Sequence, residues 1–224
     1  MGETIQLTSE DGFKLSAYRA KPAGTPRGGL VVVQEIFGVN HHIRNVADKF
    51  AADGYDVIAP ALFDRVERNF ETGYAPADIE KGRATRGKLQ LDHAIMDTRA
   101  AVNELARSGR KVGVVGYCFG GTIAWLSATR IDGVSAAVSY YGGGVADTAE
   151  EQPNCPVMFH FGETDASIPK EHWEKVRQLH PTQETFVYPG AGHGFVCDER
   201  GSYHEASAQQ ARERTFGFFR KHVG

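Results

Sequence analysis

Cysteine is scarce in this chain, and its spacing excludes two classes of protein. The three cysteines, Cys118, Cys155 and Cys197, lie far apart in 224 residues. They form no Cys-x-x-Cys pair of the kind that binds zinc or exchanges disulfides, and their number is odd. The pattern therefore argues against a disulfide-stapled secreted domain and against a zinc ribbon. We expect a reduced, cytoplasmic setting.

Long hydrophobic runs and an excess of basic charge are missing as well. No apolar stretch approaches the roughly 20 residues that span a bilayer. The first residues lack the basic and apolar regions of a signal peptide, and Gln6 stands where a myristoylation signal has Ser or Thr. The net charge of −3 offers no basic field for nucleic acid or an anionic membrane. We therefore expect a small-molecule partner, no nucleic acid, no membrane, and a monomer or small homo-oligomer.

What the chain does have is an alternation of strand and helix patterns after an N-terminal hairpin at an Asp-Gly turn. Because strands in a parallel sheet are buried on both faces, they read as continuous apolar runs. The pattern predicts an α/β fold with a mostly parallel central sheet and helices on both faces, in a single domain over 1–224. Predicted strands cover residues 4–8, 13–19, 29–33, 55–59, 112–115, 134–140, 157–161 and 185–188, and predicted helices cover 40–52, 79–107 (at least its second half), 122–129, 171–179 and 205–222.

The most informative motif is Gly116-Tyr117-Cys118-Phe119-Gly120, which follows a β-branched run and precedes a helical pattern. This is the layout of a nucleophile elbow, with cysteine in the place of serine. The flanking glycines allow a sharp turn, and the start of a helix favours the negatively charged thiolate. We therefore interpret Cys118 as a nucleophile, whereas Cys155 and Cys197 have no such context and are read as structural.

Two further residues follow later strands in the order nucleophile, acid, histidine. Asp165 and His193 each lie in a loop after a predicted strand, and glycines flank His193. A base that takes the thiol proton and an acid that orients the base complete a triad. Asp165 also suits a turn or helix cap, and Glu163 competes with it for the role of the acid. The pair His41-His42 resembles a metal pair, but adjacent helical residues point apart, so we expect no metal and no cofactor.

A carboxyl group ends the first buried strand, at Glu35. A buried glutamate is costly unless it has a partner, so Glu35 is either a solvated strand end or part of the site. In the second reading, the N–H groups of Ile36 and of Phe119 form the oxyanion hole. The polar, irregular segment 63–77 is a candidate substrate-facing loop, since long loops in compact domains are often functional.

These residues resemble the dienelactone hydrolase (carboxymethylenebutenolidase) family of the α/β-hydrolase fold. The resemblance runs along essentially the whole chain and rests on three motifs: Gln34-Glu35-Ile36-Phe37-Gly38-Val39-Asn40, Gly116-Tyr117-Cys118-Phe119-Gly120-Gly121 and Ala191-Gly192-His193-Gly194-Phe195. It implies a Cys118–His193–Asp165 triad, with Glu35 contacting the thiol and taking part in its activation when substrate binds. It also implies hydrolysis of cyclic enol esters without a metal or organic cofactor, with Phe37 as a candidate substrate contact.

The arginines depart from the family pattern. Dienelactone-processing members carry an arginine four residues after the histidine, where this chain has Cys197, and the nearest arginine is Arg200. A second family arginine corresponds loosely to Arg83 or Arg86, although either could simply be a surface residue. The resemblance therefore predicts the triad more firmly than it predicts a site for a substrate carboxylate.

The sequence thus favours a cysteine-dependent hydrolase that opens enol lactones or activated esters through a Cys118 acyl-thioester. Two alternatives stay open. One is a general carboxylesterase with a different substrate class, and the other is a hydrolase-fold binding protein without turnover.

Overall fold

The computed structural model describes residues 2–224 and arranges their strands in one eight-stranded sheet. The strand order is β1-β2-β4-β3-β5-β6-β7-β8. β2 runs antiparallel to both β1 and β4, and all other neighbouring strands are parallel. The strands are β1 (Glu3–Thr8), β2 (Lys14–Ala20), β3 (Gly28–Val33), β4 (Tyr55–Pro60), β5 (Val112–Tyr117), β6 (Val134–Tyr140), β7 (Val157–Gly162) and β8 (Glu184–Tyr188).

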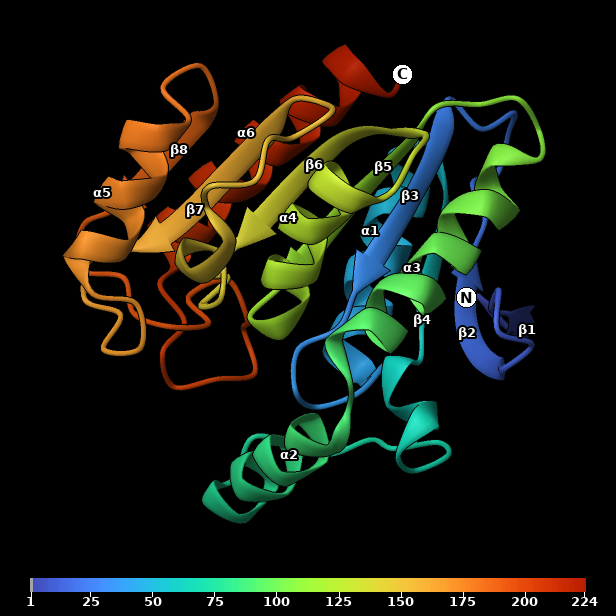
Figure 1. The fold of residues 1–224 in the computed structure, drawn as a ribbon, viewed down its shortest axis with the longest axis horizontal. Coiled ribbons are helices and arrows are strands. Elements are labelled where there is room, and N and C mark those ends of the chain that lie inside the picture. The colour runs from blue at the N-terminus through green and yellow to red at the C-terminus, as the bar shows by residue number, and fades with distance from the viewer. Residues whose placement is uncertain (1) are drawn as a thin grey trace.

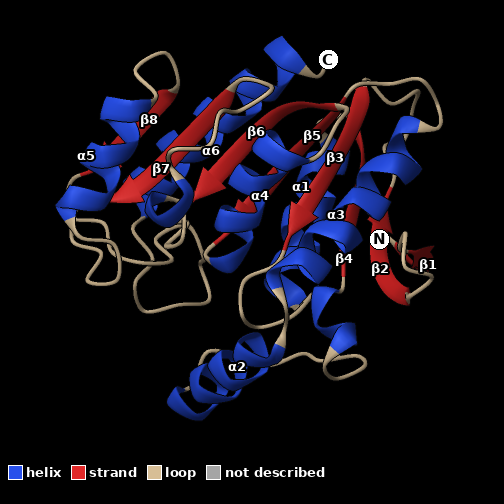
Figure 2. Ribbon diagram, in the orientation of Figure 1, coloured by secondary structure: helices blue, strands red, loops and turns tan. Residues whose placement is uncertain are grey.

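Helices cover both faces of the sheet (Figures 1 and 2). α3 (Leu91–Ala106) and α4 (Phe119–Arg130) pack on one face. α1 (His41–Ala52) and α6 (Glu205–His222) pack on the other, where Phe50 and Phe216 bring the two helices together. α5 (Lys170–Leu179) packs against the short 3₁₀ helix Ala146–Thr148, and α2 (Pro76–Lys88) projects beyond the sheet. The predicted mostly parallel sheet with helices on both faces is confirmed.

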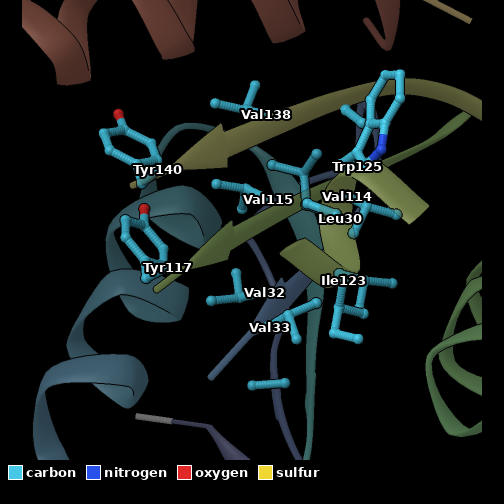
Figure 3. Close-up of a cluster of buried hydrophobic side chains, with 14 of the residues drawn as sticks. Leu30, Val32, Val33, Val114, Val115, Tyr117, Ile123, Trp125, Val138 and Tyr140 are labelled. Atoms are coloured by element: carbon cyan, nitrogen blue, oxygen red, sulfur yellow. The ribbon is translucent and has the colours of Figure 1, made fainter. Parts of the chain in front are cut away.

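The middle of the sheet is the hydrophobic core, as Figure 3 shows. Every residue of β3, β4 and β5 is buried. Valines from β3 and β5 pack against the helices on both faces, because successive residues of a strand point to opposite sides of the sheet. β-Branched side chains suit this position because they pack well on a pleated surface that is covered on both sides. No helix within residues 2–224 is long and apolar enough to cross a membrane.

The region predicted as one helix over 79–107 contains two. α2 ends at Lys88 and α3 begins at Leu91, and Leu89 between them has extended backbone angles. The Leu89 side chain is buried in the core, and the backbone leaves the helical conformation at this residue to place it there. The second half behaves as predicted, because Ile95, Thr98, Val102 and Leu105 all face the core.

The segment predicted as an irregular loop over 63–77 is held by ion pairs. It begins in a short 3₁₀ helix, Leu62–Arg65. The Arg65 guanidinium donates to Asp97 and to Asp11, with a shortest N–O distance of 2.7 Å in each pair. This segment therefore ties the N-terminal hairpin to α3, and α2 follows it at the carboxyl end of the sheet.

Candidate active site

Cys118 occupies a strained turn between β5 and α4. Its φ of 55° and ψ of −115° place a non-glycine residue in a sparsely populated region. Such a conformation costs on the order of 1–3 kcal/mol and persists only where the surroundings enforce it. The Cys118 N–H donates to Tyr140 O at 3.0 Å, which fixes the turn to the end of β6. Cys118 is the N-cap of α4, so its sulfur lies at the positive end of the helix dipole.

Two glycines let this turn close. A Cβ at Gly116 would lie 1.8 Å from Gly120 O, and a Cβ at Gly120 would lie 2.3 Å from Val33 O. Because both obstacles are backbone atoms, neither can move aside for a side chain. The elbow geometry that the motif predicts is present.

His193 and Asp165 meet across two loops at the carboxyl end of the sheet. His193 Nδ1 lies 2.7 Å from Asp165 Oδ2, and the Asp165 side chain is fully buried. Asp165 Oδ1 accepts from the Ser167 N–H at 2.8 Å, so both carboxyl oxygens have partners. The competing Glu163 is exposed and accepts from the Gly190 N–H, which places it outside the triad.

The surroundings of His193 favour its protonated form. Burial lowers the pKa of the imidazole, but the hydrogen bonds to Asp165 and Cys118, and the charges on both, raise it to about 10. Asp165 occupies Nδ1, so Nε2 is the nitrogen available to the thiol. The arrangement places the imidazolium of His193 beside the Cys118 sulfur, at the positive end of the α4 dipole, where negative charge on sulfur is stabilised.

Ile36 and Phe119 are placed to offer backbone N–H groups. Phe119 is the first residue of α4, where N–H groups have no acceptor within the helix. Ile36 follows β3 and is packed under α2, since a Cβ at Gly82 would lie 2.5 Å from Ile36 O. Both residues line the same cavity as Cys118. The structure therefore brings the two predicted oxyanion donors to the nucleophile.

A cavity of roughly 420 Å³ opens above Cys118 and His193. Segment 63–77 contributes no residue to this cavity, so the expectation of a substrate-facing loop there is wrong. The following helix α2 lines the cavity instead. The lining also includes residues that the motifs did not indicate, namely Ile79, Thr122, Gly143, Gly144 and Ser167.

Arg83, Arg86 and Arg200 all line this cavity. Arg83 is exposed, and Arg86 is half-buried with its guanidinium 4.2 Å from the centre of the Phe119 ring. Burial lowers the pKa of Arg86, which indicates that the cation is incompletely solvated. The helical spacing of three residues puts Arg83 and Arg86 on one face of α2.

Arg200 reaches the cavity through a coiled loop that no sequence pattern predicts. Cys197 N–H donates to Gly194 O, and Arg200 N–H donates to Cys197 O, in two successive turns. Gly194 has a φ of 76°, and a Cβ there would lie 2.3 Å from Arg200 Nη1. The glycine after His193 thus makes room for the guanidinium.

Glu35 is buried and faces Arg200. Glu35 Oε1 lies 3.3 Å from Arg200 Nη1, and only 1% of the Glu35 residue is exposed. Phe37 lies beneath the same guanidinium, with its ring centre 5.6 Å from Arg200 Cζ. Across residues 2–224, no hydrogen bond joins Glu35 to Cys118, and the Glu35 carboxyl group is paired with Arg200. The contact with the thiol on substrate binding stays a prediction.

Comparison with known proteins is consistent with this geometry. A model of the dienelactone hydrolase family matches residues 15–223. A Synechocystis protein named "Putative carboxymethylenebutenolidase" is 33% identical over 235 residues, which cover 96% of this chain and 95% of that protein. An Azospirillum brasilense protein of the same name is 34% identical and covers 98% of this chain and 99% of its own length.

A crystal structure from Klebsiella pneumoniae, described as a "Putative Dienelactone Hydrolase", is 32% identical with a TM-score of 0.86. The match covers 99% of this chain and 100% of that one. These similarities agree with the resemblance drawn from the three sequence motifs, and they confirm the predicted α/β-hydrolase fold.

The protonation of His193 gives the first testable prediction. Since its pKa is raised to about 10, the imidazolium is retained at neutral pH and is lost only as pH rises through that value. Asp165→Asn removes a charged partner and is expected to bring the pKa back toward 6.5. Nitrogen NMR of labelled histidines measures both values. His160 is an internal control, because burial lowers its pKa to about 3 and keeps it neutral throughout. A neutral His193 at pH 7 in the unsubstituted protein would contradict the prediction.

Proposed function

Because this chain belongs to the dienelactone hydrolase family and is a hydrolase, we propose that it opens lactones or activated esters with Cys118 as the nucleophile. The observation that carries the proposal is the strained elbow, which holds Cys118 beside His193 at the floor of an arginine-lined cavity. Each element of the proposed chemistry has a residue in reach: a sulfur nucleophile, an imidazole acid and base, and backbone donors for the oxyanion.

The proposed reaction proceeds in two stages. The Cys118 thiolate attacks the carbonyl carbon, and the negative charge that develops on oxygen is stabilised by the N–H groups of Ile36 and Phe119. The carbon–oxygen bond of the ester breaks, and His193 gives its proton to the departing oxygen. Water, deprotonated by His193, then attacks the thioester, so the acid is released and the thiol is restored.

A thiol nucleophile favours activated esters over amides. A thiolate attacks a carbonyl well, but it also leaves a tetrahedral intermediate readily. An amine leaving group would lose this competition, whereas an enolate is stabilised and departs first. The proposed substrates are therefore enol lactones and related activated esters.

The arginines favour a substrate with an anionic group. Arg83, Arg86 and Arg200 present cations around the cavity, and Arg200 is paired with Glu35. A substrate carboxylate beside Arg200 would compete with Glu35 for the guanidinium. Glu35 would then be free to turn toward the thiol and take part in its activation.

Two alternatives remain distinguishable. A general carboxylesterase would hydrolyse neutral alkyl esters as well as anionic lactones, so a substrate panel separates it from the proposal. A hydrolase-fold binding protein would turn over neither, and its Cys118 would resist iodoacetamide. The half-exposed position of Cys118 argues for a reactive thiol.

Removal of the sulfur tests the proposed nucleophile. Cys118→Ala is expected to lower kcat for lactones and p-nitrophenyl acetate by roughly 10⁴-fold or more, because the variant lacks the sulfur that forms the covalent intermediate. Cys155→Ala is the matched control, since this thiol lies outside the cavity, and it should leave kcat unchanged. Steady-state kinetics of both variants provides the measurement, and full activity in Cys118→Ala would refute the assignment.

Matched pairs of substrates, with and without a carboxylate, test the role of the arginines. A charge-assisted hydrogen bond contributes roughly 1.5–3 kcal/mol, which corresponds to about 10- to 150-fold in kcat/KM. Arg86→Gln is expected to lower kcat/KM by such a factor for the carboxylate member and to change the neutral member little. Arg107→Gln on α3 is the control, because Arg107 is exposed and absent from the cavity lining. Equal losses for both members of a pair would rule out carboxylate recognition by Arg86.

A further inference from the structure

A second group of reactive side chains lies under the loop that carries Arg200. It consists of Glu35, His42 and Cys197, which come from the end of β3, the start of α1 and the loop before α6. A carboxyl oxygen, an imidazole nitrogen and the thiol sulfur lie within 4.8 Å of one another. The three residues are 1%, 4% and 0% exposed, respectively, so the group is enclosed by protein.

Two atoms of this group lack the hydrogen bonds that burial normally requires. Among residues 2–224, Glu35 Oε2 and His42 Nε2 are buried and have no hydrogen-bond partner. The other Glu35 oxygen is the one that faces Arg200. Buried polar atoms nearly always have a hydrogen-bond partner in folded proteins. A bound cation would supply the partner that these two atoms lack.

His42 is oriented as a metal ligand would be. His42 Nδ1 faces Asp198 Oδ1 at 3.7 Å, which leaves Nε2 as the nitrogen without a partner. Histidines that bind metals usually direct their second nitrogen at a carboxylate or carbonyl oxygen in this way.

We propose that Glu35, His42 and Cys197 form a binding site for Zn²⁺. Thiolate, imidazole and carboxylate are the ligand types that zinc takes, whereas Mg²⁺ and Ca²⁺ prefer oxygen alone. Three protein ligands leave a fourth tetrahedral position for water. Coordination breaks the Cys197 S–H bond and forms an S–Zn bond, and the proton passes to solvent with no change in oxidation state.

The charges of the cluster are compatible with a divalent cation. A thiol must lose its proton to coordinate a metal, so binding releases the Cys197 proton. A carboxylate and a thiolate together neutralise Zn²⁺. Arg200 shares Glu35 with the metal, so the occupied cluster carries one net positive charge, which the carboxylates of Asp198 and Glu199 beside His42 offset.

Occupancy of this site would also bear on catalysis, in a way that rests on the proposed function. Zinc on Glu35 Oε2 would fix the carboxyl group in the cluster and prevent it from turning toward Cys118. We therefore expect zinc to inhibit lactone turnover through Glu35, separately from any direct binding to the catalytic thiol.

Metal titration of a variant without the other thiols tests the site independently of activity. In Cys118→Ser/Cys155→Ser, Cys197 is the sole remaining thiol. Calorimetry with Zn²⁺ is expected to show one saturable site with release of one proton. Titration with Co²⁺ is expected to give a thiolate-to-cobalt charge-transfer band in the near ultraviolet and the visible bands of tetrahedral Co²⁺.

Ligand substitutions in the same background assign the binding to this cluster. Cys197→Ser and His42→Gln are each expected to raise the zinc dissociation constant by about 100-fold or more, because even loss of an outer-shell partner costs roughly 10–100-fold. His41→Gln is the matched control, since it removes the adjacent, exposed histidine and should leave binding intact. Circular dichroism and thermal unfolding of each variant verify that it is folded.

The absence of saturable zinc binding in the double variant would overturn the proposal, since the cluster would then hold no metal. Binding that persists unchanged in folded Cys197→Ser or His42→Gln would also overturn it, because the metal would then lie elsewhere, for example on surface histidines. Neither result would affect the proposed hydrolase function, which depends on Cys118 and His193.

Discussion

The close contact between backbone atoms at the elbow is the constraint on which the rest of the site depends. Gly116 and Gly120 approach so closely that no Cβ fits, and the chain must pass through a positive φ at Cys118. This conformation lifts the sulfur out of the sheet at the start of α4 and aims it at His193. Cys118 can hold that strained geometry because β5 and the neighbouring β3 are fully buried in the core.

Charge balance around the nucleophile is the second organising feature. Asp165 supports the imidazolium of His193, while Arg200 holds the buried Glu35 on the other side of the cavity. Both ion pairs lie at the same cavity. A substrate anion that attracts Arg200 would therefore alter the charge next to the thiol. The buried cluster of Glu35, His42 and Cys197 is part of the same charge balance. Its carboxyl group, Glu35, connects the substrate cavity to the proposed zinc site.

The sequence predicted the strands, the elbow and the meeting of Cys118, Asp165 and His193, because these depend on local patterns and on the rule that parallel strands end at one edge. It did not predict the break at Leu89, since burial of one leucine overrode a continuous helical pattern. It placed the substrate loop at 63–77, whereas ion pairs hold that segment and α2 lines the cavity. The sequence also did not predict that Arg200 lines the cavity, because two successive turns, rather than sequence spacing, bring this side chain there.

Detection of the covalent intermediate tests the central claim most directly. Intact-protein and peptide mass spectrometry after rapid acid quench of the reaction with p-nitrophenyl acetate would measure acylation. We expect the mass of one acetyl group on the peptide that contains Cys118, removable by hydroxylamine as a thioester is. Turnover with no acyl adduct on that peptide, or an adduct on a different residue, would contradict the assignment of Cys118 as the nucleophile.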